Sequence, residues 1–231
     1  QGFLQHPDYE MEKVGEEYFH VLLNNSLFQD AKFDDLGHVI SCKMHDAVHA
    51  LAGTLLRDDV TLEMRHVSLS QFRDVRSIFE LGGNLRTFFG SFIPTTFVPI
   101  PMKTISNLRA LSLVRARLTE LPNSIGELKH LRYLDISGNM IESLPDGLTR
   151  LYNLQTFRSG RLSPLGSFTM LPKGFSKLIK LRHIVHPSEY HAMGIPIGLG
   201  MLTCLRTLPT IDASAGWGGR LSELQSLSKL E

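Results

Sequence analysis

LPNSIGELKHLRYLDISGNMIESLPDGLTRLYNLQTF, residues 121–157, contains one pattern of leucine, isoleucine and proline twice. Each copy has a leucine anchor, as in the tripeptide LRY at Leu131, and similar tripeptides recur on both sides of this stretch. The anchors are Leu85, Leu108, Leu131, Leu154, Leu181 and Leu205, at intervals of 23, 23, 23, 27 and 24 residues. A weaker copy, MRHVSL, begins at Met64. Residues 61–231 are therefore expected to form a repeat array.

A period of 20–29 residues with this leucine pattern is typical of leucine-rich repeats. The spacing L-x-x-L-x-L alternates inward and outward side chains, as a short strand requires. The Leu-Pro step then turns the chain, since proline fixes φ and prevents a preceding helix from continuing. One repeat cannot bury its own apolar face, so neighbouring repeats stack. We predict an α/β fold, a solenoid of six or seven leucine-rich repeats with parallel strands on its concave face.

Outward strand residues of these repeats are expected to be exposed on the concave face and to bind a protein partner. The predicted contact residues are Ser112, Tyr133, Asp135, Ser137, Thr156, Arg158 and His183. The alternative is a solvated face without a partner. Arginine follows five of the anchors, and these side chains either form a basic stripe or pack at the edge of the array. Asn139, in SGNMI, is the asparagine expected to satisfy backbone groups in the turn.

Composition excludes several classes of protein. The chain has 231 residues, 42% of them hydrophobic, and a net charge of +1, which disfavours a polybasic nucleic-acid-binding protein. Residues 1–60 carry 11 acids and 4 bases, net −7, whereas 61–231 carry net +8. Cys42 and Cys204 are too few for a disulfide framework or a zinc cluster, and no apolar run is long enough to span a membrane. The chain does not begin with methionine, so we expect a piece of a longer protein whose repeat array continues beyond Glu231.

Residues 1–60 lack the repeat. GEEYFHVLLNN, from Gly15, predicts a helix with Tyr18, Phe19, Leu22 and Leu23 on one face, ending at Asn24-Asn25-Ser26. LFQD and VISCKM flank a polar segment and predict a hairpin, and 46–58 predicts a second helix. This order is that of the back half of a winged-helix domain, so the predicted domains are 1–60 and 61–231. The net charge of −7 on residues 1–60 disfavours DNA binding by this unit.

CKMHDAVHALA, residues 42–52, resembles the Met-His-Asp motif of plant nucleotide-binding leucine-rich-repeat immune receptors of the coiled-coil class. The flanks agree, in EYFHVLLNNSLFQD before the motif and in RHVSL and the repeats after it. The resemblance covers essentially the whole chain. It implies a disease resistance protein fragment that runs from the winged helix to the early repeats, located in the cytoplasm.

The resemblance also implies roles for two residues in the intact parent. His45 matches the histidine that approaches the β-phosphate of ADP in the resting receptor, and Asp46 matches the aspartate that orients it. The competing interpretation is that His45 caps a helix. No G-x-x-x-x-G-K-[ST] loop is present in the sequence, so we expect no cofactor in this fragment and ADP or ATP only in the parent. The implied partners are an upstream nucleotide-binding domain and a pathogen effector or guarded host protein, with oligomerisation on activation.

Two further classes of function are compatible with parts of the sequence. A stand-alone cytosolic leucine-rich-repeat scaffold explains residues 64–231 but gives the Met-His-Asp segment no purpose. His45 and His49 imitate the spacing of a zinc protease motif, but aspartate replaces the glutamate base and no third ligand is placed, so no metal site is predicted. We therefore predict an interaction and switch protein that is not an enzyme.

Overall fold

A computed structural model describes residues 11–33, 39–44, 66–70, 82–91, 102–141, 143–159, 171–186, 197–209 and 218–230. The chain forms two compact units, 1–63 and 64–231. The predicted boundary between residues 60 and 61 lies three residues before this division.

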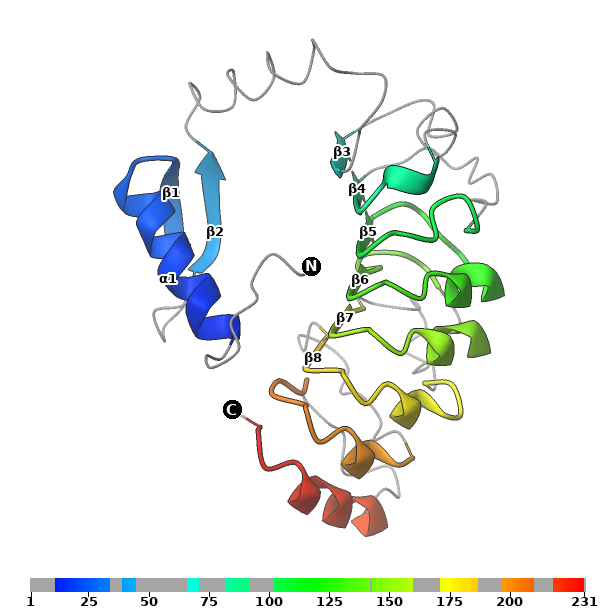
Figure 1. Ribbon diagram of the computed structural model, residues 1–231. Helices are drawn as coiled ribbons and strands as arrows, with labels where there is room; N and C mark the ends of the chain where they lie inside the picture. The colour runs from blue at the N-terminus through cyan, green and yellow to red at the C-terminus, as the bar shows by residue number, and fades with distance from the viewer. Residues whose placement is uncertain are drawn as a thin grey trace. The chain divides into compact units, whose positions relative to one another are not determined.

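The first unit contains a helix and a hairpin (Figure 1). Helix α1, Met11–Asn24, ends as expected, where the Asn25 side chain donates to the Val21 carbonyl at 2.7 Å. It begins four residues before the predicted Gly15, because MEKV lacks proline and glycine and continues the helix. Strands β1, Phe28–Phe33, and β2, Val39–Met44, pair antiparallel as the predicted hairpin.

In the first unit, Phe19 on α1 stacks on Phe28 of β1 with ring centroids 5.5 Å apart. Val14 is buried, whereas Tyr18 and Leu22, expected on the same face as Phe19, are exposed. The predicted second helix, 46–58, and the residues His45 and Asp46 lie outside the described residues.

The second unit is a parallel six-stranded sheet in sequence order. Its strands are β3 His66–Ser70, β4 Thr87–Ser91, β5 Ala110–Val114, β6 Tyr133–Asp135, β7 Thr156–Arg158 and β8 His183–Val185. From β4 to β8 each strand begins two residues after a leucine anchor, and Thr207 bridges His183 at the next repeat. The register predicted from the period is therefore confirmed, including that of the weak copy from Met64, which forms β3.

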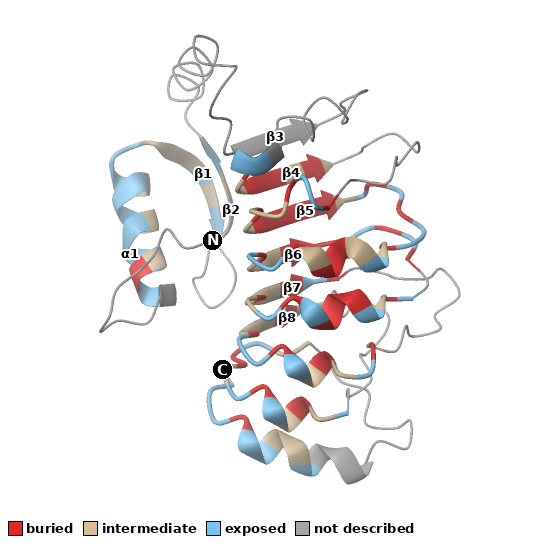
Figure 2. Cartoon of the chain, turned by 45° about the vertical axis from the view of Figure 1, so that its right-hand side comes forward, coloured by how far each residue is buried: buried red, intermediate tan, exposed pale blue. Residues whose placement is uncertain are grey.

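The short 3₁₀ helices are η1 Gly82–Asn84, η2 Asn123–Glu127, η3 Asp146–Arg150, η4 Phe175–Lys177, η5 Leu199–Met201 and η6 Gly218–Ser226. The strands line the inner side of the curved second unit, and the short 3₁₀ helices from η2 onwards lie on the side opposite the sheet, whereas η1 lies just before β4 (Figure 1). Pro122 and Pro145 directly precede η2 and η3, in extended conformation, as the Leu-Pro steps predict. The inner residues of η2 and η3 are buried, like most of β4 and β5 (Figure 2).

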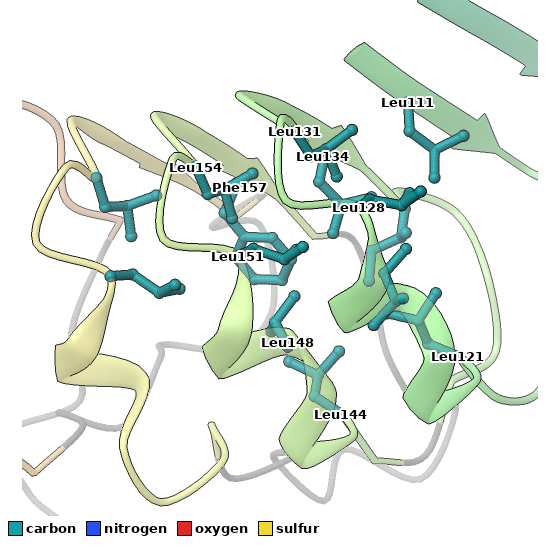
Figure 3. Packing of buried hydrophobic residues seen from close by; sticks show 14 of the residues in the cluster. Leu111, Leu121, Leu128, Leu131, Leu134, Leu144, Leu148, Leu151, Leu154 and Phe157 are labelled. Carbon is teal, nitrogen blue, oxygen red and sulfur yellow. The ribbon is translucent and has the colours of Figure 1, made fainter. Parts of the chain in front are cut away.

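One continuous hydrophobic core runs between the strands and the 3₁₀ helices. All six leucine anchors are at most 1% exposed, and Leu134 and Phe157 on the next inward strand position are fully buried. Leu128 and Leu151 close the core from the 3₁₀ side (Figure 3). Burying one such side chain contributes about 1.5–3 kcal/mol, so the stacking of repeats is the main stabilising force.

Asn139 joins neighbouring repeats inside this core. It is 2% exposed, and its side-chain oxygen accepts a hydrogen bond from the Leu118 N–H at 3.1 Å. Its amide nitrogen donates to the carbonyls of Leu113 and Ile136 at 2.7 and 2.8 Å. The predicted role of this asparagine in satisfying turn backbone groups is confirmed.

Candidate functional site

The parallel register brings the predicted contact residues together in two rows across the sheet. Tyr133 lies between Ala110 and Thr156 in the first row, and Asp135 lies between Ser112 and Arg158 in the second. Each strand places its outward residues at offsets two and four from the leucine anchor, because alternate side chains of a strand share a side. We call these outward strand residues the strand face: Thr87, Phe89, Ala110, Ser112, Tyr133, Asp135, Thr156, Arg158, His183 and Val185.

The expectation that Ser112 and Asp135 are exposed is wrong, since each is only 6% exposed. Strand β5 carries the small residues Ala110 and Ser112 on this face. The rings of Phe89 on β4 and Tyr133 on β6 therefore approach each other across β5, with centroids 6.2 Å apart. The two rings cover the small side chains and form an apolar step on the strand face.

Asp135 is the centre of a polar cluster. One carboxylate oxygen accepts hydrogen bonds from the Ser137 N–H at 2.9 Å and the Ser137 hydroxyl at 2.6 Å. The other accepts from the Tyr133 hydroxyl at 3.1 Å and lies 3.4 Å from Nε of Arg158. These donors compensate the burial of the charge, which would otherwise be costly. Asp135 is thus an internal anchor, whereas the Arg158 side chain is 47% exposed.

The same cluster changes the acidity of Tyr133. Partial burial, and then the negative charge of Asp135, raise the pKa of Tyr133 from 10.0 to about 12. The nearby Arg158 acts in the opposite direction but does not cancel these effects. The tyrosine therefore keeps its proton over the physiological range and remains a hydrogen-bond donor to Asp135.

Towards β8 the strand face carries histidine. Nδ1 of His183 lies 3.0 Å from the Thr207 hydroxyl, and Nδ1 of His186 lies 3.2 Å from the Ser159 hydroxyl. Thr156 and His183 are half-buried, as is Ser137 next to Asp135.

Phe89 and His186 were missed by the sequence prediction. Phe89 could have been found from its offset of four residues after Leu85, the same offset that selects Asp135. His186 lies one residue beyond β8, where the alternation of the strand no longer indicates a side.

The arginines that follow the anchors are packed and do not form an exposed basic stripe. Arg206 is 8% exposed, and the others, Arg86, Arg109, Arg132 and Arg182, are half-buried. Their main-chain groups also form hydrogen bonds between neighbouring repeats. The Arg109 carbonyl accepts from the backbone N–H groups of Arg132 and Tyr133 at 2.7 and 3.1 Å. The edge-packing alternative is confirmed.

Within the described ranges, no group of three or more His, Cys, Asp or Glu side chains could hold a metal ion. None of the helices that the structure describes is long and apolar enough to cross a membrane.

Two family models match the chain in the order of its two units. A model described as "Disease resistance protein Winged helix domain" matches residues 1–52, and one described as "Leucine-rich repeat region" matches residues 100–231. The chain belongs to the leucine-rich-repeat disease resistance proteins of plants.

Relatives of this family cover both units. Disease resistance protein RGA5 of rice, Oryza sativa subsp. japonica, is 25% identical over 248 aligned residues, 95% of this chain and 21% of its own length. A Solanum bulbocastanum protein named for disease resistance, RGA1, is 34% identical over 130 residues, 56% of this chain and 12% of its own length. The chain thus spans less than a quarter of either relative.

A solved structure shows the same fold for the repeats. A leucine-rich-repeat protein of Leptospira interrogans aligns with 77% of this chain and 44% of its own, with a TM-score of 0.58 and 21% identity. This likeness supports the repeat architecture alone. The predicted fold class, a leucine-rich-repeat solenoid preceded by a winged-helix unit, is confirmed.

Proposed function

We propose that this chain is the recognition and coupling part of a plant immune receptor, in which the repeats bind a pathogen effector or a host protein altered by one. The observation that carries the proposal is a disease resistance winged helix followed by repeats whose strand face holds an ordered cluster of aromatic and charged groups. Such faces recognise proteins well, because tyrosine and arginine contribute much of the binding energy in protein interfaces. A stand-alone repeat scaffold is not favoured, since it leaves the winged helix unexplained.

The winged helix couples recognition to a nucleotide switch in the upstream part of the parent protein. In this proposal His45 contacts the β-phosphate of ADP in the resting state, and Asp46 satisfies free N–H groups at the helix start and orients the histidine. Exchange of ADP for ATP, rather than catalysis by this chain, is the proposed event. Activation is then a population shift towards an ATP-bound, oligomeric receptor in the cytoplasm.

The test uses the full-length receptor that contains this chain, expressed in leaves without any pathogen. Replacing Asp46 with valine is expected to lower the fraction of receptor that retains ADP and to cause constitutive cell death. Asp146→Val is the matched control, because Asp146 is exposed on η3 in the repeat unit. Unchanged ADP occupancy together with no constitutive signalling in Asp46→Val would overturn the switch role.

A further inference from the structure

Arg158 is the outward charge of the strand face. It is the only Asp, Glu, Lys or Arg of the strand face that is exposed within the described ranges. Its Nε lies 3.4 Å from the Asp135 carboxylate, while 47% of the side chain remains accessible. The guanidinium also interacts with the Tyr133 hydroxyl, and the exposed part of the Arg158 side chain can reach a ligand.

Asp135 cannot take part in such binding directly. Its two oxygens already have four donors, from Ser137, Tyr133 and Arg158, and its side chain is 8% exposed. The aspartate instead reduces the freedom of the arginine. A guanidinium held through one nitrogen loses less conformational entropy on binding than a free one. The cluster therefore presents a pre-oriented cation beside a buried anion.

Apolar groups flank this cation on the same face. The Phe89–Tyr133 step lies on the β4 and β6 side, and Val185 is the register neighbour of Arg158 on β8. An arginine next to a tyrosine matches the composition of binding hot spots, which are enriched in these two residue types and are surrounded by contacts that exclude water. In a complex these apolar neighbours exclude water, which strengthens a charged hydrogen bond.

We propose that the strand face binds a carboxylate of its protein partner, from an Asp or Glu side chain or a C-terminus, through Arg158, with Asp135 as the positioning residue and Phe89–Tyr133 as the apolar step beside it. The inference deepens the proposed function and rests on it. Charge complementarity selects the partner: a guanidinium fork pairs with the two oxygens of a carboxylate in parallel hydrogen bonds. The strand face therefore selects an acidic segment with a neighbouring apolar side chain.

The first arm of the test selects binders from a phage library of random dodecapeptides, with the full 231-residue chain as bait. Peptides enriched on the wild-type chain are expected to share an Asp or Glu next to an aromatic or aliphatic residue. Selection on Arg158→Glu is expected to lose this preference. Lys177→Gln is the matched control, because Lys177 is an exposed cation on η4, on the opposite side of the unit.

The second arm is a double-mutant cycle with one selected peptide and its Glu→Gln (or Asp→Asn) counterpart. Either change alone, in the peptide or as Arg158→Gln, is expected to weaken binding at least tenfold in Kd. The two together are expected to cost little more than one, because each removes the same ion pair. Arg158→Lys, which keeps the charge but loses the fork, is expected to bind with intermediate affinity.

The third arm tests the positioning role of Asp135. Asp135→Asn is expected to weaken peptide binding severalfold, because the guanidinium is then held less firmly. In the Asp135→Asn background, a further Arg158→Lys change is expected to alter Kd by less than it does in the wild type. A purely structural role of Asp135 would leave the effect of Arg158→Lys the same in both backgrounds, and that result would refute the positioning role.

Three results would overturn the inference as a whole: enriched peptides without acidic preference, a cycle in which the two changes add independently, or Arg158-dependent binding to phosphatidylserine vesicles or single-stranded DNA in place of peptides. An unchanged urea midpoint of Arg158→Gln shows that its fold is intact. The Asp46→Val test in the full-length receptor needs no strand-face ligand and reports on the nucleotide switch alone. If only the carboxylate site fails, the peptide experiments fail and the Asp46→Val result stands. If the proposed switch fails, the Asp46→Val result fails as well.

Discussion

Replacing Asn139 with alanine tests whether one buried side chain ties neighbouring repeats together. The change removes three hydrogen bonds of 2.7–3.1 Å and leaves the Leu118 N–H and the carbonyls of Leu113 and Ile136 without this partner in the core. At roughly 1 kcal/mol for each bond, and with water able to reach only part of the site, the free energy of unfolding should fall by about 3 kcal/mol.

The assay is urea unfolding of the whole chain, followed by circular dichroism. With a slope of about 2 kcal/mol per molar urea, the loss corresponds to a midpoint about 1.5 M lower. Asn139→Asp keeps the acceptor for Leu118 but places a negative charge against two carbonyls, so it should be at least as destabilising at neutral pH. Asn153→Ala is the control, since Asn153 makes its hydrogen bonds at the surface and its loss should cost under about 1 kcal/mol. An Asn139→Ala midpoint equal to that of the control would refute the reasoning.

Two other predictions follow from close packing and from burial. A Cβ at Gly147 would collide with the Asn123 carbonyl of the previous repeat, so Gly147→Ala should destabilise the unit by about 1–3 kcal/mol. The control is Gly83→Ala, whose added Cβ meets nothing within 4 Å and should be near neutral in the same urea assay. Equal midpoints for the two variants would contradict the close stacking of η2 and η3. The pKa of Tyr133, raised from 10.0 to about 12, means that the folded state holds this proton more tightly than the unfolded state, so stability is unaffected below about pH 10 and falls as the pH rises towards 12. The absorbance difference at 295 nm between the wild type and Tyr133→Phe should therefore titrate well above pH 10, and a step centred at pH 10 would contradict the burial of this phenol.

The sequence period predicted the strands well because each repeat carries its own register. From β4 to β8, each strand begins two residues after its leucine anchor. This offset is constant although the intervals between anchors vary from 23 to 27 residues. The role of Asn139 was predictable for the same reason, since its position in the repeat fixes which backbone groups it faces.

Burial on the strand face could not be predicted from the period. Alternation says on which side a side chain lies, but Ser112 is covered by two rings that come from other repeats, 23 residues before and 21 after it. Asp135 is buried because Tyr133 and Ser137 of its own repeat and Arg158 of the next strand converge on it, and the period does not show that these side chains turn towards one another. The start of α1 at Met11 could have been predicted, because Met11, Val14 and Tyr18 follow the spacing of one helix face.

The central claim is that this chain belongs to a nucleotide-switched receptor, and sequencing the parent transcript upstream of the Gln1 codon tests it most directly. The account predicts an in-frame G-x-x-x-x-G-K-[ST] loop followed by the rest of a nucleotide-binding domain, which would supply the phosphates that His45 is proposed to contact. An open reading frame that starts close to Gln1, with no such loop upstream, would contradict it.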